Sequence, residues 1–254
     1  MGPDRKQIAR TLIRRGQSMR RSAVGTPEFT THAAANALVS DLQRSPHAYV
    51  IACLMDRQIK AERAWEIPYR LAERLGTFEF RELRRFRRST LVRAMREPTT
   101  LHRFAAIMGG VAHDAIRLID VRYDGDASVI WSGRPSSADL VLRFLEFPGA
   151  GAKIATMAAN LLVRYWNIPL ADHFSIDVSV DVHVRRVLIR LGLVEPGANV
   201  EQIVYMARAM SPAFPGLIDA PLFLLGREIC RPTRPRCDEC YLRRWCPSQG
   251  REWP

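Results

Sequence analysis

The segment at residues 147–153, Phe-Pro-Gly-Ala-Gly-Ala-Lys, constrains the fold of this chain more than any other stretch of its sequence. An apolar run enters the segment, Pro148 ends that run, Gly149 and Gly151 are spaced for a tight turn, and an alanine-rich apolar run follows as far as Leu162. This order predicts a helix, a hairpin and a second helix. Glycines leave the backbone N–H groups of a turn accessible, so the hairpin is suited to bind an anion such as a DNA phosphate.

A second motif, Val-Asp-Val-His-Val, occupies residues 180–184. Asp181 directly precedes apolar residues at helical spacing, Val184, Val187 and Leu188, and aspartate is a preferred residue at a helix N-cap. A carboxylate at the start of a helix can also face a cleft. We therefore expect Asp181 to cap a helix, and a catalytic role is compatible with that position.

Lysine is scarce in this chain. Only three of the 38 basic residues are lysines, at positions 6, 60 and 153, and the rest are arginines. A lysine after a turn commonly contacts phosphate or solvent, but a chain with this preference is expected to use arginine wherever positive charge alone suffices. Schiff-base chemistry needs an amine that can lose its proton, which lysine can do and arginine cannot. Lys153 is therefore a candidate nucleophile.

Four of the five cysteines lie in residues 230–246, with the spacing C-x6-C-x2-C-x5-C. Cysteines this close together predict a metal centre, and both zinc and a [4Fe–4S] cluster bind four thiolates. Zinc sites usually combine two close pairs, whereas this loop has a single C-x2-C, which favours the cluster. The fifth cysteine, Cys53, lies in an apolar helical context and is expected in the core. The candidate ligands are Cys230, Cys237, Cys240 and Cys246.

The formal net charge of +12 indicates a polyanionic partner, because each basic side chain placed on a phosphate releases counterions. No apolar run reaches membrane-spanning length, and the basic residues 1–21 contain no apolar signal core. These features predict a cytoplasmic, nucleoid-associated protein that does not bind membranes. Apolar residues recur at helical spacing and show no sustained alternation, which predicts an all-α fold.

The hairpin motif, the Asp181 motif and the cysteine spacing together resemble the helix-hairpin-helix DNA glycosylases, and specifically endonuclease III with its [4Fe–4S] cluster loop. The resemblance covers roughly residues 46–247. It implies two helical lobes with the active-site cleft between them. The helical barrel with the hairpin is expected at 42–165, and the iron–sulfur cluster domain is expected to combine 1–41 with 166–254.

The resemblance also implies a function, that of a monomeric base-excision repair glycosylase with AP-lyase activity acting on double-stranded DNA with a damaged base or abasic site. The target base, by default an oxidised pyrimidine, would be flipped out of the duplex. Lys153 would form a Schiff base with the sugar while Asp181 assists, and the four cysteines would hold the cluster. The implied DNA contacts are Gln58, which would fill the gap left by the flipped base, together with Gly149, Gly151, Arg231, Arg234, Arg236, Arg243 and Arg244.

The connection between Lys153 and Asp181 is longer than the endonuclease III pattern, and this leaves alternatives open. One is a glycosylase for deaminated or mismatched bases, which could act without lyase activity. Another, of a different class, is a non-catalytic iron–sulfur protein that binds DNA. The connection contains two further carboxylates that could replace Asp181 and four rings that can stack on a base or pack in the core: Asp172, Asp177, Tyr165, Trp166, His173 and Phe174.

Overall fold

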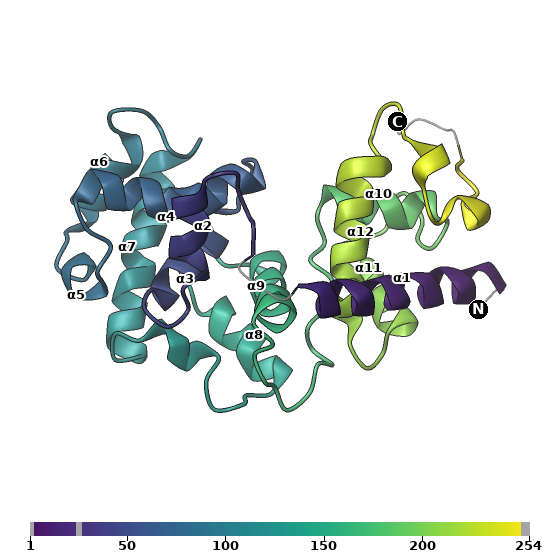
Figure 1. The fold of residues 1–254 in the computed structure, drawn as a ribbon, viewed down its shortest axis with the longest axis horizontal. Helices are drawn as coiled ribbons and strands as arrows, with labels where there is room; N and C mark the ends of the chain where they lie inside the picture. Colours follow the sequence, from purple (N-terminus) through teal and green to yellow (C-terminus); the bar gives the residue numbers. More distant parts are fainter. Residues whose placement is uncertain (1–2, 24–26, 250–254) are drawn as a thin grey trace. The chain divides into compact units, whose positions relative to one another are not determined.

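The computed structural model describes residues 3–23 and 27–249, and within these ranges every regular element is a helix (Figure 1). The predicted all-α class is thereby confirmed for the described part of the chain.

The chain folds into two compact units. We call Gly25–Pro135 together with Leu142–Ala158 the hairpin unit. The cysteine unit combines Met1–Val24, Ser136–Val141 and Ala159–Pro254. These divisions fall at other residues than the predicted domain boundaries, and two of the helices contribute residues to both units.

The hairpin unit is built around α3 (Pro46–Met55), all ten residues of which are buried. A helix that is apolar on every side is stable only when it is covered on every side, and α2, α4 and α7 pack against α3. The other helices that lie wholly in this unit are α2 (Ala33–Ser40), α4 (Ala61–Leu75), α5 (Phe80–Leu83), α6 (Arg88–Arg96), α7 (Ala105–Arg122) and the 3₁₀ turn Ala127–Ile130.

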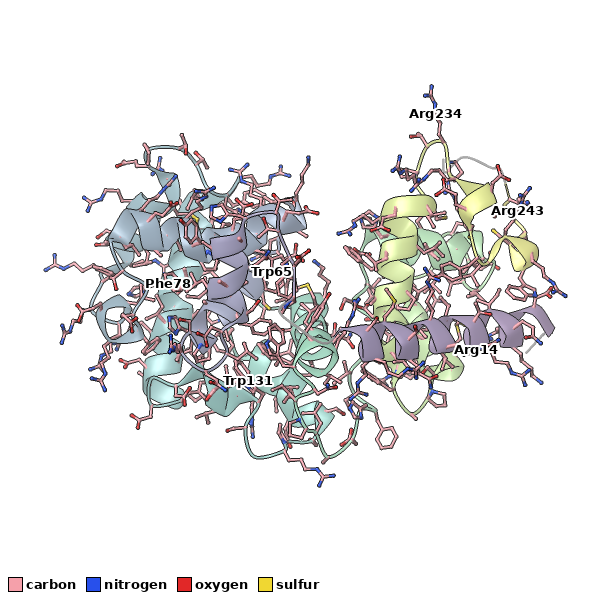
Figure 2. All side chains as sticks on the ribbon, viewed as in Figure 1. Arg14, Trp65, Phe78, Trp131, Arg234 and Arg243 are labelled. Atoms are coloured by element: carbon pink, nitrogen blue, oxygen red, sulfur yellow. The ribbon has the colours of Figure 1, made fainter. Side chains whose placement is uncertain are left out.

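Tyr49 connects α3 to its neighbours. Its ring lies 5.9 Å from the rings of both Trp65 and Trp131, measured between centroids, and Figure 2 shows these two tryptophans among the helices of the unit. The Tyr49 hydroxyl donates a 2.6 Å hydrogen bond to the carbonyl oxygen of Ala158 on α9. This bond satisfies the one polar group that the ring carries into the core.

The cysteine unit includes the N-terminal helix α1 (Pro3–Ser22), whose apolar face is buried in the core of that unit. Ile8 and Leu12 are 1% and 0% exposed, and burial of each contributes about 1.5–3 kcal/mol. The unit also contains α10 (Val182–Arg190), α11 (Val200–Met210), α12 (Asp219–Leu224), the π-helical turn Leu225–Ile229 and 3₁₀ turns at Pro215–Ile218, Cys237–Glu239 and Arg243–Trp245.

No single helix in the described ranges is both long and apolar enough to cross a membrane; α11 and Pro215–Ile229 reach that length and composition only as a pair bent by 96°. Residues of both segments contribute to the core of the cysteine unit.

Candidate functional site

The predicted helix-hairpin-helix is present. Helix α8 (Ser137–Leu145) leads into the hairpin and α9 (Ala152–Tyr165) leaves it. Phe147 is buried and stacks on Tyr123, which anchors the turn to the hairpin unit. The first N–H groups of any α-helix have no partner within it, so the start of α9 offers backbone donors to an anion.

The two hairpin glycines have different surroundings. Gly149 has a φ angle of +90°, and a Cβ atom there would lie 3.3 Å from the Val111 methyl groups and 3.4 Å from the Arg57 guanidinium. Gly151 has no heavy atom within 4 Å of the position of a Cβ. The fold itself therefore requires glycine at position 149, whereas position 151 faces open space.

Lys153 lies in the first turn of α9 and forms an ion pair with Asp56. Its Nζ donates to Asp56 Oδ2 at 2.5 Å and to the Asp56 backbone oxygen at 3.4 Å. The Asp56 side chain is 13% exposed and the Lys153 side chain 36%. The pair is thus mostly shielded on the carboxylate side and open on the amine side.

Asp56 was not identified from the sequence. It caps the C-terminus of α3, and Tyr49, Cys53 and Asp56 recur at helical spacing on one face of that helix. This face meets α9 in antiparallel order, because Tyr49 bonds to Ala158 and Asp56 pairs with Lys153. The spacing was visible in the sequence, but nothing there shows that α9 packs on this face.

The loop after α3 also carries Gln58. Gln58 is exposed, lies outside any helix and has a φ angle of +54°, a conformation that is uncommon for residues other than glycine. The sequence pattern predicts a helix that continues through Gln58, and the structure places this residue in a loop. Arg57 in the same loop approaches Gly149, so this loop and the hairpin are neighbours within one unit.

His102 is fully buried next to the backbone of Met55 and Arg57, where α3 ends and the loop begins. Its Nδ1 accepts a 3.0 Å hydrogen bond from the backbone N–H of Phe104. Burial lowers the pKa of His102, and the backbone carbonyls of Met55 and Arg57 act in the opposite direction. The His102 ring thus packs against the loop that follows α3.

Asp181 lies in the cysteine unit and is the N-cap residue of α10, as predicted. Its Oδ1 accepts hydrogen bonds from the backbone N–H groups of His183 at 2.9 Å and Val184 at 2.7 Å. The other carboxylate oxygen has no hydrogen bond in the described part of the chain. The cap thus uses one oxygen of Asp181.

The two alternative carboxylates have structural partners. Asp177 forms two hydrogen bonds with Arg208, at 2.8 and 2.9 Å. Asp172 accepts hydrogen bonds from the Ser137 hydroxyl and from the backbone N–H of Phe174. Both carboxylates help to hold the long connection in place.

The four rings of the long connection are not core residues. Phe174 is 61% exposed, which excludes the core alternative for this ring. Tyr165, Trp166 and His173 are half-buried; Tyr165 and Trp166 pack edge to face, and His173 lies against Phe214 with ring centroids 4.7 Å apart. Cys53, in contrast, is fully buried as expected, and burial raises the pKa of its thiol.

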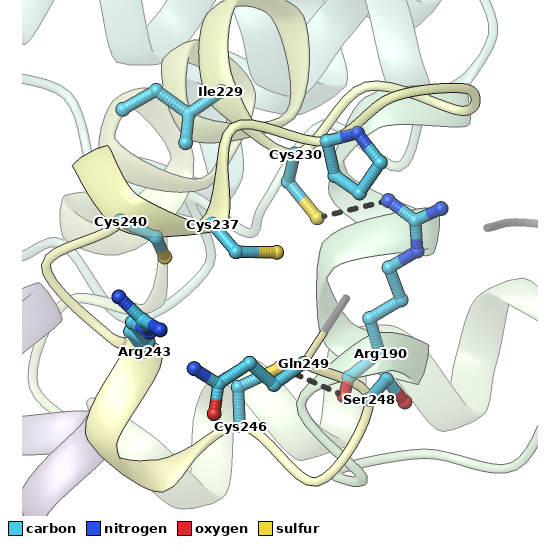
Figure 3. Close-up of a pocket in the computed structure, with 10 residues that line it drawn as sticks. Arg190, Ile229, Cys230, Cys237, Cys240, Arg243, Cys246, Ser248 and Gln249 are labelled. Atoms are coloured by element: carbon cyan, nitrogen blue, oxygen red, sulfur yellow. Dashed lines mark hydrogen bonds between the residues drawn. The ribbon is translucent and has the colours of Figure 1, made fainter. Parts of the chain in front are cut away.

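The four clustered cysteines line one pocket, and Figure 3 shows their side chains around it. Arg190 Nη1 donates a 3.4 Å hydrogen bond to Cys230 Sγ, and Cys246 Sγ donates one of the same length to the Arg190 carbonyl oxygen. Burial raises the pKa of Cys240 and of Cys246. Among the described residues, no three His, Cys, Asp or Glu side chains are grouped so as to hold a single metal ion.

The arginines of the cysteine loop are all exposed. Figure 2 shows Arg234 directed away from the ribbon, whereas Arg243 lines the cysteine pocket (Figure 3). Some also hold the loop: Arg236 bonds to the Glu228 carbonyl oxygen and pairs with Glu239, and Arg243 pairs with Asp238. Of the predicted site residues, Gln58, Gly149, Gly151 and Lys153 therefore belong to the hairpin unit, and Asp181, the cysteines and the loop arginines to the cysteine unit.

No protein-family model matches the chain. The chain is 32% identical over 143 residues to a chloroplastic endonuclease III homologue of Arabidopsis thaliana, a match that covers 54% of this chain and 33% of the relative. It is also 32% identical over 108 residues to endonuclease III of Thermotoga maritima, covering 42% of this chain and 46% of that relative. The chain thus spans less than half the length of each of these two relatives.

Solved structures with a similar fold include an endonuclease III trapped as a covalent intermediate with DNA, with a TM-score of 0.64 and 18% identity over 96% of both chains. A thermostable thymine-DNA glycosylase has a TM-score of 0.63 and 14% identity, over 96% of this chain and 95% of its own. At these identities the likeness shows a shared helical fold.

Proposed function

We propose that this chain, endonuclease III-like in sequence and in fold, is a DNA glycosylase with AP-lyase activity that acts on double-stranded DNA. The observation that carries the proposal is the position of Lys153. An amine in the first turn of the helix after the hairpin is open to solvent on one side and is held by Asp56 on the other. A nucleophile needs both accessibility and a fixed position.

The proposed reaction begins with a target nucleotide flipped out of the duplex, because a stacked base cannot be attacked. The Lys153 amine attacks the sugar C1′, the bond from C1′ to the base breaks, and the base leaves with that electron pair. The Asp181 carboxylate stabilises the positive charge that develops on the sugar. Opening of the sugar ring gives an imine to Lys153, and β-elimination then cleaves the strand at the abasic site.

DNA contacts are proposed on both units. In the hairpin unit, the hairpin backbone would bind a phosphate, and the exposed Gln58 would occupy the gap left by the flipped base. In the cysteine unit, the exposed loop arginines would bind further phosphates. We further propose that the protein acts as a monomer in the cytoplasm, associated with the nucleoid.

A matched pair of glycine substitutions tests the hairpin. Gly149→Ala is expected to destabilise the protein by about 1–3 kcal/mol, because alanine at φ +90° is strained and its methyl would meet Val111. Gly151→Ala is expected to leave the thermal unfolding midpoint unchanged and to weaken DNA binding, because its methyl would occupy the open space that a phosphate needs. Thermal unfolding and fluorescence-anisotropy titration with duplex DNA measure the two effects. Equal DNA affinities for wild type and Gly151→Ala would contradict the proposed phosphate contact.

Cys230, Cys237, Cys240 and Cys246 are proposed to hold a [4Fe–4S] cluster. Their donor chemistry fits this group: four thiols line one pocket, and Arg190 donates a hydrogen bond to one of the sulfurs. The cluster, when bound, fixes the shape of the loop that carries the exposed arginines. Zinc would use the same four thiolates, so the iron and acid-labile sulfide content of the purified protein distinguishes the two metals.

Borohydride trapping tests the proposed function. The purified protein is incubated with duplexes that carry an abasic site, thymine glycol, uracil or a thymine mismatch, and borohydride reduces any imine to a stable covalent complex. A complex on the abasic duplex and on thymine glycol is expected. Base release without a complex would indicate a glycosylase without lyase activity. Salt-dependent DNA binding with neither release nor a complex would indicate the non-catalytic DNA-binding protein.

A second substrate class, deaminated or mismatched bases, is favoured by one observation. Phe174 in the long connection is an exposed ring, available to stack on a base. The thymine-DNA glycosylase described above resembles this chain in fold as closely as endonuclease III does, with TM-scores of 0.63 and 0.64. Complex formation on the uracil or mismatch duplex in preference to thymine glycol would support this class.

A further inference from the structure

The Lys153 amine has one carboxylate partner in the described part of the chain, Asp56, and the two residues are far apart in sequence. At 2.5 Å from Nζ, the Asp56 Oδ2 atom is within direct proton-transfer distance. The proposed mechanism requires a neutral amine, whereas an ion pair holds an ammonium. Something must therefore take a proton from Lys153 before or during attack.

Both side chains stand at helix ends that disfavour their charges. Asp56 caps α3 at its C-terminus, where the helix dipole is negative, and Lys153 lies in the first turn of α9, where the dipole is positive. The usual preference is the reverse, with acidic groups at the N-terminus and basic groups at the C-terminus. The two helix dipoles therefore act against the attraction between the charges of the pair and in the direction of proton transfer from Lys153 to Asp56.

The packing of α3 holds Asp56 in this position. Every residue of α3 is buried, and the Tyr49 hydroxyl bond to Ala158 ties α3 to α9 at a second point along the same face. The other titratable groups on this face are Tyr49 and Cys53, and the Cys53 thiol responds to the charges of both Asp56 and Lys153. The adjoining loops carry Arg57, Lys60, His102 and Arg103.

We propose that Asp56 is a catalytic base for the reaction of Lys153. This inference rests on the proposed function. An N–H bond of the Lys153 ammonium breaks, its proton goes to Asp56 Oδ2, and the electron pair stays on Nζ. The amine then bonds to C1′ as the base departs with the electron pair of its glycosidic bond. The departing base takes up the proton that Asp56 holds, so the carboxylate is restored and no other reactant is needed.

Asp56→Asn tests this role, because asparagine keeps the shape of the side chain but cannot accept the proton. The rate of borohydride trapping on an abasic duplex is expected to fall about 10²–10⁴-fold near neutral pH. The deficit is expected to shrink as pH rises, since solvent then deprotonates Lys153. Asp114→Asn is the matched control, because Asp114 pairs with Arg88 elsewhere in the hairpin unit, and it is expected to trap like wild type.

A second variant separates proton transfer from a structural role. Asp56→Ala is expected to be as slow as Asp56→Asn and to recover rate when formate is added, because a small carboxylate can enter the space and accept the proton. Formate is not expected to accelerate Asp56→Asn, whose amide fills that space. A purely structural role would give slow variants with no rescue and no change in pH profile, and would overturn the inference.

The outcomes distinguish this inference from the proposed function. If wild type forms the covalent complex and Asp56→Asn forms it at the same rate or faster, the proposed function stands and Asp56 is not the base. A faster variant would mean that the ion pair restrains Lys153. If wild type forms no complex on any duplex, both proposals fail.

Discussion

Replacement of Lys153 by alanine is expected to abolish covalent trapping on the abasic duplex and to reduce strand cleavage by at least about 10³-fold, because no other group would supply the bond to C1′. Borohydride reduces an imine, and only an amine such as that of Lys153 can form one with the sugar. Borohydride trapping followed by denaturing electrophoresis measures the complex directly.

Two further lysine variants make this result interpretable. Lys153→Arg keeps the positive charge opposite Asp56 but cannot form an imine, so it is expected to bind DNA and to form no complex. Lys6→Ala removes an exposed lysine of α1 and is expected to trap like wild type. A complex that persists in Lys153→Ala would assign the imine to another amine, and Lys60 would then be examined.

Replacement of Asp181 by asparagine is expected to lower the rate of base removal by about 10²–10³-fold while leaving stability almost unchanged. Asparagine is as good an N-cap as aspartate, so the hydrogen bonds to the His183 and Val184 N–H groups can persist. The negative charge that would stabilise the sugar cation is lost. Single-turnover kinetics of base release and thermal unfolding measure the two effects separately.

Asp181→Ala completes this test, because it removes both the charge and the cap. It is expected to lose the same activity as Asp181→Asn and also about 0.5–2 kcal/mol of stability. Asn199→Ala is the control for capping alone: Asn199 caps α11 in a reciprocal arrangement with Gln202, and its loss is expected to lower stability without slowing catalysis. Full activity in Asp181→Asn would remove Asp181 from the mechanism.

Much of the local structure could be predicted from the sequence. The hairpin between two helices, the Asp181 cap and the burial of Cys53 each follow from a short pattern: glycines after a proline, a capping residue before a periodic run, and a small apolar residue in an apolar helix. Such patterns act through backbone angles, hydrogen bonds and side-chain polarity within a few residues, so they hold whatever the rest of the chain does.

The position of Gln58 and the exposure of Phe174 could not be predicted in the same way. The segment around Gln58 reads as a continuation of an apolar helix, but α3 ends at Met55, and Gln58 adopts a left-handed backbone conformation. Phe174 is apolar, yet it is 61% exposed, and the backbone beside it is held by hydrogen bonds to Asp172 and Ser137.

By itself the sequence thus determined that the chain is helical, where its hairpin lies and which four cysteines are gathered in one loop. Only the tertiary structure decided that Asp56 is the partner of Lys153, that the loop with Gln58 lies beside the hairpin and that the four thiols line a single pocket. The physical reason is that a helix face is a local property, whereas the choice of which face packs on which depends on burying the apolar surface of all helices at once.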